Sequence, residues 1–284
     1  MAIKDLLVYL DQSPATEARL QAALMLAERL GAHVTALHLI AEPFLRATSG
    51  GMAGHHMPAE VIREHLAHAA AEAEAILTAA RAAAERHGVE LDVVRESGSL
   101  DKLPTLLAQH ARHTDLVVIG QPDLASGGVD DTALTEAAFM DSGHPALVIP
   151  RAWSGTLPPR RVLIAWDGSR EAARAATDAI PLLQHAELVL ILAVDARDTL
   201  GRTPSPPGED LATHLSRHAV KAEVRSMASN GASVTDVLLS QVRSDAADLL
   251  VMGGYGHSRL REIFVGGTTR YILEHMTVPV LFAH

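Results

Sequence analysis

The chain contains two copies of one sequence pattern, and this repeat limits its fold more than any other feature. Residues 4–43 and residues 160–197 each read as an apolar run, an aspartate, a serine that opens a helix, and a second apolar run. Two further pairs of segments correspond in the same order: 114–120 with 247–253, and 144–150 with 278–284. Such self-similarity indicates a duplicated structural unit.

The length of the chain agrees with two domains. The chain has 284 residues, so each copy has about 140, which is close to the usual size of a domain. The proline-rich segment PRAWSGTLPPRR, residues 150–161, lies between the copies and is typical of a linker. The sequence therefore predicts a first domain over 1–150, a linker over 151–160 and a second domain over 161–284.

Within each copy, short apolar runs alternate with longer segments of helical periodicity. This alternation is typical of βαβ units and of a parallel sheet with helices on both faces. Each copy is therefore predicted to be a Rossmann-like α/β domain with a five-stranded parallel sheet. Strands are expected near 4–10, 33–39, 89–95, 115–119 and 145–149 in the first copy, and near 161–166, 187–193, 221–226, 248–252 and 278–282 in the second.

Helices are expected between these strands. Ser13, which precedes a proline, and Ser169 are predicted to cap the first helix of each copy, because serine at this position accepts a hydrogen bond from a free backbone N–H. A long alanine-rich helix is predicted near 58–87, with a shorter counterpart near 208–218.

Composition excludes several classes of function. The chain has no cysteine, which excludes disulfides, thiolate zinc sites and thiol catalysis. Its formal charge is −10 and its only lysines are Lys4, Lys102 and Lys221, which argues against a surface for nucleic acid. No apolar run reaches about 18 residues and no signal segment is recognisable, so we expect a cytoplasmic protein that does not enter a membrane.

A glycine-rich segment follows the apolar run 248–252. Glycines let the backbone approach a ligand closely, and a helix that begins near Gly266 or Gly267 presents its N–H groups and dipole to an anion. The segment lacks the lysine of a Walker A loop. It also lacks the third glycine of the G-x-G-x-x-G dinucleotide fingerprint, and it follows the fourth strand of its copy, whereas that fingerprint follows the first. The remaining pattern is G-x2-G-x9-G, formed by Gly253, Gly256 and Gly266.

This segment and Asp167 are predicted to lie together. Asp167 follows the first strand of the second copy, and Gly253 follows the fourth. A sheet that runs outward through strands 1, 2 and 3 and then returns for strands 4 and 5 has its topological switch point between strands 1 and 4. Ligands of open α/β sheets bind at that point.

With these motifs, the chain resembles the universal stress protein family in its tandem form, over essentially all of its length. The resemblance implies two adenine nucleotide alpha hydrolase-like domains and a bound ATP with Mg²⁺. It assigns the phosphates to Gly253, Gly256 and Gly266, the ribose or metal to Asp167, and the adenine to backbone groups of Ala193 or Val194. The sequence departs from the family pattern at Gly267, where serine or threonine is expected. Thr268 and Thr269 follow and offer a hydroxyl one residue late.

The first copy lacks this glycine pattern. Gln121, Pro122 and Asp123 follow Gly120, so the turn loses an N–H at the proline and gains a carboxylate that repels phosphate. We therefore expect that the first domain does not bind ATP and serves as a built-in partner of the second. The resemblance implies pairing through the last strands, 146–150 against 280–284, in an intramolecular pseudo-dimer, and it leaves open a further homodimer.

Other sites are less well supported. Helical pairs of histidines are compatible with zinc but lack a defined third ligand, so surface histidines are the preferred interpretation. These pairs are His65 with His68, His110 with His113, and His214 with His218; His55 and His56 lie in a glycine-rich loop that remains the metal candidate. Arg259, Arg261 and Arg270 are candidate phosphate ligands or members of ordinary ion pairs with Glu262 or Glu274. No motif of a serine hydrolase is present.

The sequence thus predicts a nucleotide-dependent switch in the stress response, read by an unidentified protein partner. We expect at most slow ATP hydrolysis, because Asp167 is the only candidate base and is assigned to ribose or metal. Two alternatives remain open: an interaction scaffold that binds no nucleotide, and a protein that binds another small ligand in the first copy.

Overall fold

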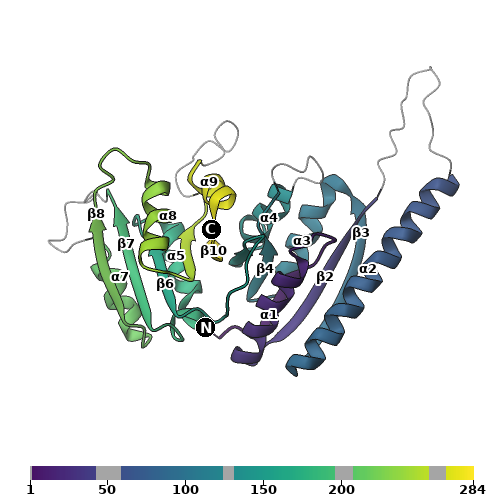
Figure 1. Cartoon of the computed structure of the whole chain (residues 1–284), viewed down its shortest axis with the longest axis horizontal. Helices are drawn as coiled ribbons and strands as arrows, with labels where there is room; N and C mark the ends of the chain where they lie inside the picture. Colours follow the sequence, from purple (N-terminus) through teal and green to yellow (C-terminus); the bar gives the residue numbers. More distant parts are fainter. Residues whose placement is uncertain (1, 43–58, 124–130, 196–206, 256–266) are drawn as a thin grey trace, which may run out of the picture.

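A computed structural model describes residues 2–42, 59–123, 131–195, 207–255 and 267–284 (Figure 1). The first half contains β1 (Asp5–Tyr9), α1 (Thr16–Leu30), β2 (His33–Glu42), α2 (Ala59–His87), β3 (Leu91–Ser99), a 3-10 turn (Leu100–Lys102), α3 (Leu103–Ala111), β4 (Leu116–Gly120), α4 (Asp131–Met140) and β5 (Ala146–Ile149). The second half contains β6 (Arg161–Ala165), α5 (Arg170–Asp178), α6 (Ile180–Leu183), β7 (Leu188–Val194), α7 (Glu209–Arg217), β8 (Ala222–Met227), α8 (Val234–Ser244), β9 (Leu249–Gly253), α9 (Gly267–His275) and β10 (Val280–Ala283). The predicted α/β class and the predicted strands are confirmed.

All ten described strands form one sheet, in the order β3-β2-β1-β4-β5-β10-β9-β6-β7-β8. Strands are parallel within each half. Each half therefore has the predicted order 3-2-1-4-5, with topological switch points between β1 and β4 and between β6 and β9. At these points the connections leave in opposite directions and open a crevice at the carboxyl ends of the strands.

The two halves are joined through their last strands. β5 and β10 pair in antiparallel fashion, with Val148 opposite Val280 and Ala146 opposite Phe282, as predicted for 146–150 and 280–284. Because β-strand side chains alternate between the faces of a sheet, each face carries its own apolar core. One core contains buried residues of α1, α2, α5, α6 and α7 and the other contains those of α3, α4, α8 and α9, so each core includes residues of both halves.

The starts of the first helices differ between the halves. Ser169 caps α5, and its Oγ accepts a hydrogen bond from the Ala172 N–H at 3.1 Å, as predicted. The predicted cap at Ser13 is wrong, because α1 begins only at Thr16, after Ala15, and has no side-chain cap. The Ser13 hydroxyl instead accepts a hydrogen bond from Arg19 Nη2 at 3.1 Å.

The long helix α2 and the short helix α7 are close to their predicted bounds. Among the residues that the structure describes, no helix is both long enough and apolar enough to cross a membrane.

Candidate functional site

In the second domain, Asp167 lies two residues beyond the end of β6. Its side chain is exposed, and its Oδ1 accepts a hydrogen bond from the Ser169 N–H at 2.9 Å. This bond and the serine cap of α5 hold the turn that carries Asp167. The turn thus places a carboxylate at the surface, next to the switch point between β6 and β9.

The residues assigned to adenine lie at the end of β7. Ala193 is fully buried and Val194 is half-buried, and they pair with Ser226 and Met227 of β8. The chain then turns through Asp195, which has a positive φ of 49° and donates its N–H to the Met227 carbonyl at 2.9 Å. Both assigned residues therefore belong to the same carboxyl edge of the sheet as Asp167.

The glycines at the end of β9 are required by packing. A Cβ on Gly253 would lie 2.6 Å from the backbone nitrogen of Ala172, at the start of α5. A Cβ on Gly254 would lie 2.5 Å from Cε2 of Phe139, in α4 of the first domain. Both contacts are too short for a real Cβ, so this turn requires glycine whether or not a ligand binds. Gly256 and Gly266 lie outside the described residues.

The first turn of α9 faces this glycine turn. The N–H of Tyr255, which has a positive φ of 56°, donates a hydrogen bond to Oγ1 of Thr269 at 3.2 Å. Thr269 is buried, whereas Gly267 and Thr268 are exposed. The Thr269 hydroxyl therefore binds another part of the protein, whereas the Thr268 hydroxyl lies at the surface of the described start of α9.

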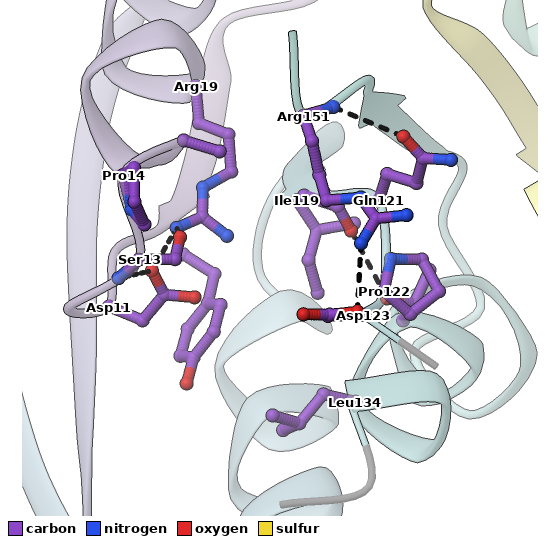
Figure 2. Close-up of a pocket in the computed structure, with 14 residues that line it drawn as sticks. Asp11, Ser13, Pro14, Arg19, Ile119, Gln121, Pro122, Asp123, Leu134 and Arg151 are labelled. Carbon is purple, nitrogen blue, oxygen red and sulfur yellow. Dashed lines mark hydrogen bonds and ion pairs between the residues drawn. The ribbon is translucent and has the colours of Figure 1, made fainter. Parts of the chain in front are cut away.

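The first domain has an aspartate at the corresponding place, in a different environment (Figure 2). Asp11 Oδ1 accepts hydrogen bonds from the Ser13 N–H at 2.8 Å, from the Thr16 hydroxyl at 2.8 Å and from the guanidinium of Arg19. Burial alone would raise the pKa of Asp11, but the charge of Arg19 and these hydrogen bonds outweigh it and lower the pKa to about 2. Asp11 is thus held as a carboxylate in an internal ion pair.

Sequence analysis did not identify Arg19, although a comparison of the two copies contains the signal. Arg19 follows Asp11 by eight residues, and the residue eight positions after Asp167 is Ala175. Arg19 is only 4% exposed and Ala175 is fully buried. The domain that keeps the glycine pattern therefore has no cation at the position where the other domain neutralises its aspartate.

Gln121 occupies the place of Gly254 in the first domain. Both residues donate a backbone N–H to the last strand of their own half, Gln121 to Ile149 at 2.8 Å and Gly254 to Ala283 at 2.9 Å. The Gln121 side chain then reaches across the joint, the β5–β10 boundary between the two halves. Its Nε2 donates a hydrogen bond to the carbonyl of Leu273, in α9, at 2.7 Å. The second domain has a glycine at this position, without a side chain, whereas the first domain has a side chain that hydrogen-bonds to α9.

A second contact across the joint begins at Tyr255 in the glycine turn. Its hydroxyl donates a hydrogen bond to Glu136 of α4, and its ring stacks on Phe139 with centroids 6.1 Å apart. Burial and the adjacent Glu136 carboxylate raise the pKa of Tyr255, so the phenol keeps its proton. The turn that is predicted to bind phosphate is therefore connected to a helix of the first domain.

The histidines form no described metal site. Within the described part of the chain, no cluster contains three or more histidine, aspartate or glutamate side chains arranged to hold a metal ion. The ring centroids of His214 and His218 lie 4.9 Å apart, in an edge-to-face arrangement. The loop with His55 and His56 lies outside the described residues. Arg270 forms an ion pair with Glu274 at 3.3 Å, and the other candidate arginines, Arg259 and Arg261, also lie outside the described residues.

Comparisons with known proteins agree on one family. The model of the Universal stress protein family matches residues 2–134 and 159–284. A universal stress protein of Synechocystis sp. is 25% identical over 301 residues, which cover 98% of this chain and 99% of that protein. One from Thermus aquaticus is 30% identical over 135 residues, which cover 43% of this chain and 96% of that protein.

The crystal structure of a universal stress protein from Archaeoglobus fulgidus has the same fold. It aligns with a TM-score of 0.70 at 15% sequence identity, over 98% of this chain and 95% of that chain. The likeness extends over both halves of the sheet.

Proposed function

The chain belongs to the universal stress protein family, and on that premise we propose that its second domain, 161–284, binds an adenine nucleotide as ATP with Mg²⁺. One observation carries the proposal: the aspartate that follows the first strand has a different environment in each of the two copies. Asp167 is exposed at the switch point of the second domain, whereas Asp11 is bound to Arg19 in the first. An exposed carboxylate at the carboxyl edge of such a sheet can accept a hydrogen bond from a ribose hydroxyl or bind a hydrated cation.

The start of α9 supplies the donors for phosphate. The N–H groups of Gly254 and Tyr255 are already bonded within the protein, so the described glycine turn serves mainly to position the chain. The first N–H groups of a helix have no intrahelical partner and attract anions. In the described part of the chain α9 begins at Gly267, so we assign this role to the N–H groups of Gly267 and Thr268, and the exposed Thr268 hydroxyl adds a donor.

Mg²⁺ would be held by oxygen ligands, for which Asp167 is the described carboxylate of this site. The cation would neutralise the phosphate charge. Because Asp167 is assigned to ribose or metal, it is not free to activate water, and we expect at most slow hydrolysis of ATP.

We further propose that nucleotide acts as a switch for a protein partner. Tyr255 ties the glycine turn to Glu136 and Phe139 of the first domain. A ligand that binds one arrangement of this turn more tightly than another shifts the population of both domains. The occupied and empty states would thus present different surfaces near α4 and α9.

The test is calorimetric titration of the purified protein with ATP–Mg²⁺, together with mass spectrometry of nucleotide that co-purifies. Asp167→Asn and Gly266→Val should each weaken binding at least about tenfold, because one loses a charged ligand and the other a close backbone approach. Asp92→Asn, which changes an exposed aspartate of the first domain, is the matched control. Unchanged affinity in both site variants would contradict the assignment, and a wild type that binds no nucleotide would favour the interaction scaffold.

A further inference from the structure

The first domain contains a cavity of about 280 Å³ at the carboxyl ends of β1 and β4 (Figure 2). Asp11 and Arg19 lie on one side of it, and Asp123 and Arg151 lie on the other. Ile119 and Leu134 contribute apolar surface to the wall that also carries Asp123. The cavity therefore occupies the switch point of this domain, the place where open α/β sheets bind ligands.

Arg19 has unused hydrogen-bonding capacity at this cavity. All of its hydrogen bonds to described residues leave from Nη2, and its Nε is buried without a partner. Its Nη1 lies against Gly120, where an added Cβ would be 2.5 Å away. A buried donor without an acceptor costs free energy. The buried Nε is out of reach of a ligand and Nη2 is occupied, so Nη1 is the Arg19 donor that remains for an acceptor in the cavity.

Arg151 provides a second guanidinium from the opposite wall. Its Nη1 donates to Asp123 Oδ1 at 2.8 Å, and its side chain is 49% exposed. Figure 2 shows the guanidinium groups of Arg19 and Arg151 on either side of the space. Arginine presents a planar set of N–H donors that matches a carboxylate.

The charges and size of the cavity limit its ligand. Each arginine is paired with one aspartate, so these four side chains carry no net charge, and the two carboxylates oppose a polyphosphate far more strongly than a singly charged anion. Small-molecule pockets usually range from about 300 to 1,000 Å³, so this cavity is suited to a compact molecule. Its apolar wall at Ile119 and Leu134 favours an aliphatic or aromatic body.

We propose that this cavity binds a small organic monocarboxylate. Its carboxylate lies between Arg19 and Arg151, and its apolar body contacts Ile119 and Leu134. The first domain is then a ligand-binding domain with a specificity different from that of the second. This site is separate from the proposed nucleotide site and does not depend on it.

The experiment is calorimetric titration of the full chain, without nucleotide, with butyrate, 4-methylpentanoate and benzoate. The uncharged amide of each acid tests the need for the carboxylate. Ala15→Phe fills the cavity from a half-buried lining position, and Arg151→Gln removes the exposed guanidinium. Arg160→Gln is the matched control, because Arg160 is also exposed and paired with a carboxylate, that of Glu187, in the second domain. Circular dichroism verifies that each variant is folded.

We expect at least one acid to bind at millimolar concentration, and its amide to bind at least about tenfold more weakly. Ala15→Phe should abolish binding, Arg151→Gln should weaken it about tenfold or more, and Arg160→Gln should leave it unchanged. The proposal is overturned if none of the three acids binds, if the amides bind equally well, or if Ala15→Phe has no effect.

Discussion

Replacement of Asp11 by asparagine is expected to destabilise the protein in a pH-dependent manner. The pKa of Asp11 is about 2 in the folded protein against an ordinary value of 3.8. A carboxyl group with a lowered folded pKa stabilises the folded state fully above its unfolded pKa, and this contribution is lost as pH falls through the folded pKa. The difference corresponds to about 2 kcal/mol at pH 7 and to about 1 kcal/mol at pH 3.

Urea unfolding of the wild type and of Asp11→Asn at pH 7 and pH 3 measures this contribution. Arg19→Met should cost about 3 kcal/mol or more at pH 7, since it leaves a largely buried carboxylate without its cation. The double variant should then cost less than the sum of the single ones. Asp123→Asn is the control, because its pair with Arg151 is exposed and should contribute less than about 1 kcal/mol. A cost of Asp11→Asn that is equal at both pH values would refute the reasoning.

Three further predictions concern the second domain and the joint. Gly267→Ser should strengthen ATP binding about tenfold in calorimetry, because an added Cβ meets nothing within 4 Å and the hydroxyl restores the family pattern; weaker binding would contradict the phosphate role of this helix start. Gly253→Ala should lower the free energy of unfolding in urea by about 1–3 kcal/mol, since its Cβ would lie 2.6 Å from the Ala172 nitrogen. An unchanged free energy of unfolding would show that α5 can shift to accommodate the Cβ without cost. Tyr255→Phe should leave ATP affinity within about twofold but abolish ATP-induced changes in amide hydrogen exchange of α4, because it removes the hydrogen bond to Glu136; persistence of those changes would exclude this route.

The fold was predictable because buried parallel strands and their turns leave strong local patterns. Asp167 and Gly253 could be placed at one edge of the sheet from the order of the strands alone. These inferences use periodicity and position, which the sequence shows directly. The β5–β10 pairing was expected from the resemblance to the family, and the need to cover two apolar edge strands is consistent with it.

The contacts between distant residues could not be predicted in this way. Tyr255 and Glu136 are 119 residues apart, and Gln121 and Leu273 are 152 residues apart, so their contacts depend on the geometry of the joint. The short contacts of Gly253 also require coordinates, because the sequence permits a role in ligand binding and a role in packing equally.

The joint between β5 and β10 has a consequence for how such a protein can change. In a dimer of identical chains, every substitution at a twofold joint occurs on both sides at once. Here Gln121 binds the carbonyl of Leu273 from one side. Its counterpart on the other side is Gly254, where an added side chain would overlap with Phe139. A substitution that would be excluded in one half is thus tolerated in the other. Joining the copies in one chain therefore lets the two halves acquire different residues at equivalent positions without losing the sheet that they share.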